Sequence, residues 1–209
     1  NEEMARELIE LIEDMPGQAI KGIDLLANEV NTPSLETGQG IYIPILKAVQ
    51  DGRIRLNRTM HAGELGDFRN VRDAMIMGAQ RIGHGIKLRE DPVAIEYARK
   101  MNVGTVCSLV SNQLLKVWPS YSTHPFLNYL RLGMPVSQST DDEGMFRTDI
   151  SNECVIAVTN TDIQYSELIQ MSRNAVSQSF AGDTMKATLM ANLDSEILAF
   201  EVEFKPTNV

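Results

Sequence analysis

Hydrophobic positions along the chain alternate between two kinds of spacing. Segments with an apolar residue at every third or fourth position, typical of amphipathic helices, alternate with short continuous apolar runs of strand length. The predicted helices cover residues 3–15, 43–50, 69–80, 92–100 and 125–132, and further helices fill most of 149–204, the last starting at Asp183. The predicted strands cover residues 20–26, 54–60, 81–85, 103–108 and 135–139. Strands that alternate with helices throughout indicate parallel pairing and an α/β fold.

Local signals refine two of these helices. Asp91 and Pro92 are suited to the N-cap and the first residue of the fourth predicted helix. A Gly- and Thr-rich loop is expected over 32–40, before a helix over 43–50 that would carry Pro44 in its first turn.

The spacing of the strands indicates which α/β fold this is. The strand ends lie near Asp24, His61, His84, Cys107 and Asp141. The intervals are 37, 23, 23 and 34 residues, about 29 on average, and a (β/α)8 TIM barrel has a unit of ~31 residues. An open doubly wound sheet would also suit five strands, but the glycine-rich phosphate loop that often accompanies it is absent from the sequence. We therefore expect a (β/α)8 barrel of which only the last five or so βα units are present.

Composition and net charge limit the classes of binding partner and the cell compartments to be expected. The 209 residues carry a formal net charge of −9, which argues against nucleic acid or an anionic membrane as the main partner. No apolar run approaches the ~20 residues of a membrane span. Cys107 and Cys154 form no CxxC pair and are expected to be reduced, buried thiols, as in a cytoplasmic protein. A secreted or periplasmic location stays open, because the sequence begins at Asn1 and reads as the later part of a longer chain.

Ionisable residues gather at the ends of the predicted strands. His61 and Glu64 follow the second strand, and His84 stands between two glycines at the end of the third. Asp141 and Asp142 follow the fifth. Taken singly, each has a structural explanation, as a hydrogen-bonded imidazole or a helix-capping acid. Because the carboxyl ends of barrel strands meet at one rim, together they predict a divalent metal site beside an acid–base group.

The order of these motifs resembles one family, the adenosine and AMP deaminases, metal-dependent members of the amidohydrolase group. The motifs that carry the resemblance are Gly22-Ile23-Asp24-Leu25 with Glu29 after it, Met60-His61-Ala62-Gly63-Glu64, Arg81-Ile82-Gly83-His84-Gly85, Ser111-Asn112, His124-Pro125, Pro135-Val136-Ser137 and Ser139-Thr140-Asp141-Asp142. The resemblance covers nearly the whole chain, and it implies hydrolytic deamination of a 6-aminopurine nucleoside, adenosine to inosine plus ammonia.

The resemblance also implies a role for each strand-end residue. His61 and Asp141 correspond to ligands of one divalent ion, usually zinc, which activates a water molecule. Glu64 resembles the proton shuttle that protonates purine N1 while hydroxide attacks C6. His84 is similar to the residue that orients the metal-bound water and helps deprotonate it, and Asp142 to the group that hydrogen-bonds purine N7.

The family's H-x-H pair of metal ligands belongs to its first strand, and this sequence contains no such pair. We therefore expect residues 1–209 to be the C-terminal portion of a single metal-dependent deaminase barrel domain. The remaining N-terminal segment would be another chain or disordered, or a homo-oligomer would cover the open edges of the sheet. The isolated chain is expected to be inactive or to bind metal poorly.

Other functions stay open beside adenosine deamination. An AMP deaminase would need a cation for the 5′-phosphate, and Lys116 and Arg147 are candidates. A related amidohydrolase could act on another amino-heterocycle. A non-catalytic binding or interaction protein is the third possibility, because Ala27 and Glu143 stand where the family usually has glycine and proline. We expect His124, which precedes a proline in a Ser/Thr-rich loop, to be structural.

Overall fold

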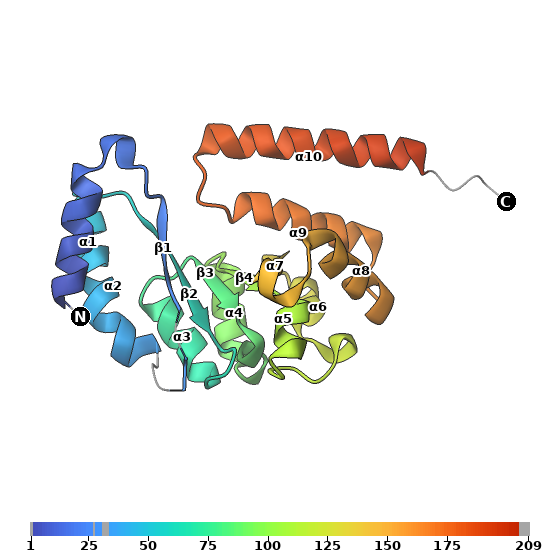
Figure 1. Ribbon diagram of the computed structural model, residues 1–209, viewed down its shortest axis with the longest axis horizontal. Helices are drawn as coiled ribbons and strands as arrows, with labels where there is room; N and C mark the ends of the chain where they lie inside the picture. Colours follow the sequence, from blue (N-terminus) through green and yellow to red (C-terminus); the bar gives the residue numbers. More distant parts are fainter. Residues whose placement is uncertain (1, 27, 31–33, 205–209) are drawn as a thin grey trace.

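Five parallel strands form one sheet at the centre of the protein (Figure 1). The computed structural model describes residues 2–26, 28–30 and 34–204. The strands are β1 (Gly22–Leu25), β2 (Asn57–Ala62), β3 (Arg81–His84), β4 (Gly104–Cys107) and β5 (Val136–Gln138). Their order in the sheet is their order in the sequence, β1-β2-β3-β4-β5, and every neighbouring pair is parallel.

Helices connect the strands and cover the sheet. The α-helices are α1 (Glu2–Asp14), α2 (Ser34–Gln50), α3 (Phe68–Ile76), α4 (Pro92–Lys100), α5 (Leu109–Leu114), α6 (Phe126–Arg131), α7 (Glu143–Phe146), α8 (Ile150–Asn160), α9 (Tyr165–Ser177) and α10 (Asp183–Glu203). Short 3-10 helices cover Pro16–Gln18, Ile86–Glu90 and Tyr121–Thr123. Parallel strands in sequential order, each followed by a helix, are consecutive units of a (β/α)8 barrel. A doubly wound sheet would reverse its strand order at a switch point, and the described strands contain no such reversal.

The two faces of the sheet differ in chemistry. Along β2, Met60 and Ala62 are fully buried and belong to the main hydrophobic core with the helices. Thr59 and His61, which alternate with them, line a cavity on the other face. β2 therefore directs apolar side chains toward the helices and polar side chains toward the interior of the partial barrel.

The strand register aligns the carboxyl ends of the central strands at the same height of the sheet. Ala62 of β2 pairs with His84 of β3, and Cys107 of β4 pairs with Gln138 of β5. Residues that follow these positions are consequently delivered to one rim of the sheet.

The expected loop over 32–40 and the helix over 43–50 are wrong in their bounds, because α2 begins at Ser34 and contains Pro44 in its interior. Tertiary contacts outweigh local composition here. A Cβ at Gly38 would lie 2.8 Å from Cε of Met77, so glycine permits close packing of α2 on the end of α3. Tyr42 is buried one turn later and donates a hydrogen bond to the carbonyl of Thr59.

Most other expectations about the elements are confirmed. The five strands lie where the pattern places them, and Asp91 caps α4 by accepting hydrogen bonds from the N–H groups of Val93 and Ala94. The helix expected over 69–80 ends at Ile76 because Gly78, with φ of +83°, takes the left-handed conformation that stops a helix. Of the two expected buried thiols, Cys107 is buried and Cys154 is only partly buried.

The C-terminal third is helical, as expected, and lies beside the end of the sheet. Helix α9 packs against β5, and α10 runs along α9 at the top of the view in Figure 1. Within the described part of the chain, no helix combines the length and apolarity that crossing a membrane requires.

One tyrosine joins α6 to the segment that follows β3. The hydroxyl of Tyr129, which is 1% exposed, accepts a hydrogen bond from the Arg89 N–H at 2.7 Å. It lies 2.9 Å from the carbonyl oxygen of Ile86, to which it donates. This contact ties the short helix Ile86–Glu90, which follows β3 in the sequence, to α6.

Replacing this hydroxyl should destabilise the protein measurably. We expect Tyr129→Phe to lower the free energy of unfolding by about 1–3 kcal/mol, because the N–H of Arg89 and the carbonyl of Ile86 lose a partner. Tyr97→Phe, at a position that is 44% exposed, is the matched control and should change it by less than about 0.5 kcal/mol. Urea denaturation measures both, and equal midpoints for the two variants would contradict this explanation.

Candidate active site

Three potential metal-binding side chains meet at the carboxyl rim of the sheet. His61 lies near the end of β2, His84 ends β3, and Asp141 follows β5. One donor atom from each lies within 4.8 Å of the other two. The two imidazole rings are 5.1 Å apart between centroids. Residues separated by up to 80 positions in the sequence thus converge on one point.

The backbone is strained at two of these positions. His84 and Asp141 both adopt left-handed φ angles, +63° and +57°. For residues other than glycine, such conformations cost on the order of 1–3 kcal/mol and concentrate at functional sites. Gly83 contributes by its small size, since a Cβ there would lie 3.1 Å from Cγ of His61. The side chains are therefore brought together at the expense of an unfavourable backbone conformation at His84 and Asp141.

Asp24, on β1, fixes the orientation of His61. Its carboxylate lies 3.1 Å from Nδ1 of His61, and this hydrogen bond is the largest cause of the raised pKa of that imidazole. A carboxylate can only accept here, so Nδ1 carries a proton and the lone pair of the neutral ring lies on Nε2. Metal-bound histidines are commonly oriented by a carboxylate in this way. Asp24 belongs to the motif Gly22-Ile23-Asp24-Leu25, but its position in the sequence does not predict this role.

Glu64 stands beside the cluster in a largely desolvated position. One of its oxygens lies 3.7 Å from Nε2 of His84 and 3.4 Å from Nδ2 of Asn112. Burial, followed by the charge of Asp141, raises the pKa of Glu64 to about 7. A carboxyl group with such a pKa can both take up and release a proton near neutral pH, which is what general acid–base catalysis requires.

A second glutamate holds the loop that carries Glu64. Glu29 is 5% exposed, and its carboxylate accepts backbone N–H bonds from Gly63, Glu64, Leu65 and Gly66. The last three are 2.7–3.0 Å long. A buried carboxylate is tolerated only when such donors compensate for its lost hydration. The loop conformation after β2 therefore depends on a residue from the segment after β1.

Helix α5 supplies further polar contacts to the site. Ser111 donates a hydrogen bond of 2.6 Å to a carboxylate oxygen of Asp141. The N-terminus of α5 is in turn held by buried Glu153, which accepts from the N–H groups of Leu109 and Val110. Asp141 is thus oriented from α5, and α5 is anchored on α8.

His84 is the most buried member of the cluster, with 4% of its surface exposed. Burial, followed by the neighbouring His61, lowers the pKa of His84 to about 4, so the ring is neutral at neutral pH. Its Nδ1 lies 3.1 Å from Nδ2 of Asn112, which is completely buried. Its Nε2 faces Glu64 and, at 4.0 Å, Asp141.

The donor set suits a divalent metal ion. His61, His84 and Asp141 border a cavity of about 190 Å³ that is also lined by Asp24 and Arg81. Imidazole nitrogen and carboxylate oxygen are donors that zinc accepts, so His61 and Asp141 could each supply one ligand with the ring of His84 beside them. In the described part of the chain, this is the one group of three such residues close enough to share an ion.

Several expected residues lie away from the cavity lining. Asp142 is exposed and forms the N-cap of α7, of which Glu143 is the first residue. Lys116 and Arg147 are exposed in the segments after β4 and β5. Ala27 lies outside the described residues.

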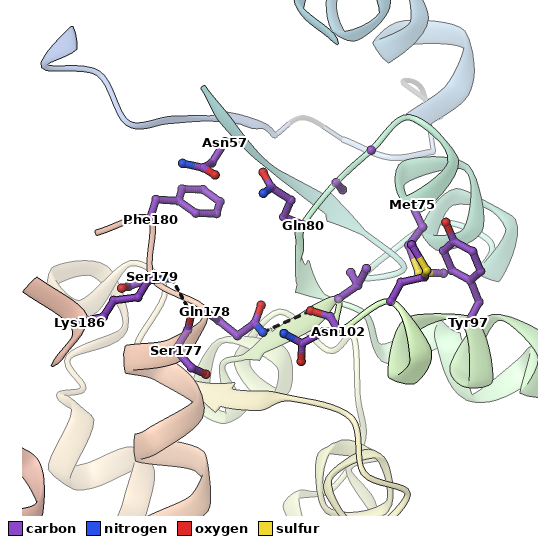
Figure 2. A pocket seen from close by; sticks show the side chains of 14 residues that line it. Asn57, Met75, Gln80, Tyr97, Asn102, Ser177, Gln178, Ser179, Phe180 and Lys186 are labelled. Carbon is purple, nitrogen blue, oxygen red and sulfur yellow. Dashed lines mark hydrogen bonds between the residues drawn. The ribbon is translucent and has the colours of Figure 1, made fainter. Parts of the chain in front are cut away.

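A larger cavity, of about 390 Å³, lies at the opposite end of the sheet (Figure 2). It is lined where β2, β3 and β4 begin, by Asn57, Gln80 and Asn102. Gln178, from the end of α9, donates a hydrogen bond to the carbonyl of Asn102 across it. In βα barrels this end serves stability and the opposite end serves catalysis, so we assign the chemistry to the smaller cavity, where His61, His84 and Asp141 converge.

Comparisons with known proteins agree with this geometry. Residues 1–196 match the family model described as adenosine deaminase. The chain is 31% identical over 168 residues to an adenosine deaminase of Aliivibrio fischeri, covering 80% of this chain and 48% of that protein. It resembles the crystal structure of adenine deaminase from Arthrobacter aurescens, with a TM-score of 0.79 and 26% identity over 94% of this chain and 58% of that one. It also resembles Arabidopsis ADAL complexed with GMP, with a TM-score of 0.78 and 26% identity over 94% and 55% of the two chains.

Loss of the Glu29 carboxylate should loosen the Glu64 loop. We expect Glu29→Gln to lower the free energy of unfolding by about 2–3 kcal/mol, because an amide nitrogen would face backbone N–H donors that now bind a charge. Glu10→Gln, on the exposed surface of α1, is the matched control. Chemical denaturation measures both, and a Glu29→Gln variant as stable as the control would show that these hydrogen bonds do not hold the loop.

Proposed function

Because the chain belongs to the adenosine deaminase family, we propose that it acts in the hydrolytic deamination of a 6-aminopurine nucleoside, converting adenosine to inosine and ammonia. The observation that carries the proposal is Glu64, whose pKa is about 7, beside the converging donors of His61, His84 and Asp141. That arrangement combines a proton-transfer group with a place for a metal-activated water. Hydrolysis at an aromatic carbon that bears an amino group needs both.

The chain spans about half the length of the curated relatives it matches. We propose that residues 1–209 form the C-terminal portion of a single deaminase barrel domain. In the described residues, β1 and β5 each pair with one neighbour only. Their outer edges can accept further strands, which would close the barrel around the cavity.

We propose that His61, through Nε2, and Asp141 hold a zinc ion. When bound, zinc lowers the pKa of a water molecule and supplies a nucleophile at neutral pH. The hydrogen bond from His61 to Asp24 keeps Nε2 available, and the hydrogen bond from Ser111 orients the Asp141 carboxylate. Further donors would come from outside this sequence, because the H-x-H pair of the family is absent from it.

Glu64 carries the proton transfers in this proposal. Its carboxylate takes a proton from the attacking water and gives that proton to N1 of the purine as the hydroxide oxygen adds to C6. It then takes up the proton that the added oxygen releases and delivers it to the amino group, which departs as ammonia. Asp142, on the exposed side of the rim, is the proposed hydrogen-bond partner of purine N7.

A nucleotide substrate is the second candidate. One structural neighbour is ADAL complexed with GMP, so a related fold accommodates a purine nucleotide. Lys116 and Arg147 are exposed cations beyond the strand ends and are the groups we would assign to a 5′-phosphate. A substrate panel of adenosine, AMP and adenine, assayed with and without charge-neutralising substitutions at these two positions, separates the possibilities. A phosphate role predicts lost activity toward AMP alone.

Removing the proton-transfer group should abolish turnover. In the intact, zinc-supplied protein, we expect Glu64→Gln to lower the rate of ammonia release from adenosine by about 100-fold to 10,000-fold. Glu90→Gln, at an exposed position, should leave the rate unchanged. A Glu64→Gln variant that retains activity within about tenfold of the parent would remove Glu64 from the mechanism.

Zinc should stabilise the folded protein through the proposed ligands. At a zinc concentration 100 times the Kd, binding adds about 2.7 kcal/mol to the free energy of unfolding, which corresponds to a Tm rise of roughly 5–10 °C for a chain of this size. His61→Gln and Asp141→Asn should each remove most of that rise, whereas exposed Asp51→Asn should retain it. Absence of any zinc-dependent shift in the intact protein would favour a non-catalytic member of the family.

A further inference from the structure

A buried chain of hydrogen bonds links the backbone of α6 to His84. The N–H of Phe126 donates to Nδ1 of His124 over 3.3 Å. Nε2 of His124 lies 3.2 Å from Oδ1 of Asn112, and Nδ2 of Asn112 lies 3.1 Å from Nδ1 of His84. His124, Asn112 and His84 are 7%, 0% and 4% exposed, so no solvent competes with these contacts.

The donor and acceptor at each step of this hydrogen-bond chain follow from the backbone N–H of Phe126. A backbone N–H can only donate, so Nδ1 of His124 is an acceptor and the proton of that neutral ring lies on Nε2. Nε2 therefore donates to Asn112, which places the amide oxygen of Asn112 toward His124. The amide nitrogen then faces His84 and donates to Nδ1, which leaves the proton of His84 on Nε2.

The reverse orientation of the Asn112 amide is unfavourable at both ends. Its nitrogen would donate to Nε2 of His124, so that ring would carry its proton on Nδ1, against the N–H of Phe126. Its oxygen would also lie where Nδ2 now sits, 3.4 Å from a carboxylate oxygen of Glu64. An unmatched pair of buried donors costs about 1–3 kcal/mol, so the observed orientation is the stable one.

We propose that Asn112 and His124 are positioning residues that hold His84 in the neutral tautomer protonated at Nε2. His84 then presents a hydrogen-bond donor to the space it shares with Glu64 and Asp141. In this state Nε2 has no lone pair for a metal ion or for a proton. This inference rests on the proposed deaminase function, in which the Nε2–H of His84 donates a hydrogen bond to the attacking water oxygen. Glu64 alone then takes up the proton that this water releases. This assignment departs from the expectation that His84 helps to deprotonate water.

The neighbouring imidazole is held in the opposite tautomer. Asp24 draws the proton of His61 to Nδ1, whereas Asn112 draws the proton of His84 to Nε2. The two rings, 5.1 Å apart, thus present a lone pair and a donor to the same cavity. One ring is prepared to bind a metal ion and the other to hydrogen-bond an oxygen.

Nitrogen NMR tests the proposal directly, because the chain contains only three histidines. The experiment uses the chelator-treated chain labelled with ¹⁵N-histidine at neutral pH, with each ring assigned from its single substitution. Long-range proton–nitrogen correlations distinguish protonated from unprotonated ring nitrogens. We expect His84 and His124 each to show a protonated Nε2 and an unprotonated Nδ1. A proton on Nδ1 of His84, or an equal mixture of the two tautomers, would overturn the proposal.

A single substitution tests the role of the amide. Asn112→Asp replaces the donating nitrogen with a second accepting oxygen, so the proton of His84 should move to Nδ1 to donate to that oxygen, while His124 keeps its proton on Nε2 and donates to the other oxygen. Asn128→Asp, at an exposed position of α6, should leave all three rings unchanged. If Asn112 were merely structural, the tautomer of His84 would stay the same in the folded variant. Should Asn112→Asp fail to fold, the spectrum of the parent chain decides alone.

The tautomer proposal and the proposed function can be refuted separately. A protein without zinc affinity or deaminase activity that still shows the Nε2–H tautomer of His84 would remove the proposed function and leave the positioning role standing. An active deaminase with the proton on Nδ1 of His84 would support the proposed function and refute the positioning role.

Discussion

Parallel pairing of the five strands in sequential order determines where the functional side chains lie. It places the end of every strand at the same rim, so residues far apart in the sequence become neighbours without any long-range motif to specify them. The register of Ala62 with His84 brings the second and third strand ends level, and Asp141 arrives from β5. Left-handed backbone at His84 and Asp141 then completes the grouping around the cavity.

The second feature of the site is that its ionisable groups are held by partners from neighbouring units. Asp24 orients His61 from β1, Glu29 holds the loop of Glu64, and Asn112 contacts His84 from α5. Buried charges and amides of this kind are expensive unless they are fully hydrogen-bonded. Each partner comes from a βα unit adjacent or nearly adjacent to the residue it holds, so the site acquires its geometry only when several units assemble.

The sequence predicts the strand ends and the residues they carry, because alternating periodicity locates the strands and the rule for parallel sheets locates their carboxyl ends. It does not predict α2, where the contact of Gly38 with Met77 outweighs a composition typical of a loop. Nor does it predict the roles of Asp24, Glu29 and Asn112. Their hydrogen bonds to His61, to the Glu64 loop and to His84 span 28 to 37 residues and depend on loop conformation, which periodicity does not encode. The motifs of the family contain these residues without indicating what they contact.

We propose that the strand ends form one metal centre with Glu64 beside it. The decisive experiment is a crystal structure of the intact protein with zinc, with anomalous data recorded at the zinc absorption edge. We expect an anomalous peak about 2.0–2.2 Å from Nε2 of His61 and from a carboxylate oxygen of Asp141, with Nε2 of His84 outside bonding distance. Zinc bound elsewhere, with His61 and Asp141 both free of it, would rule out this metal centre.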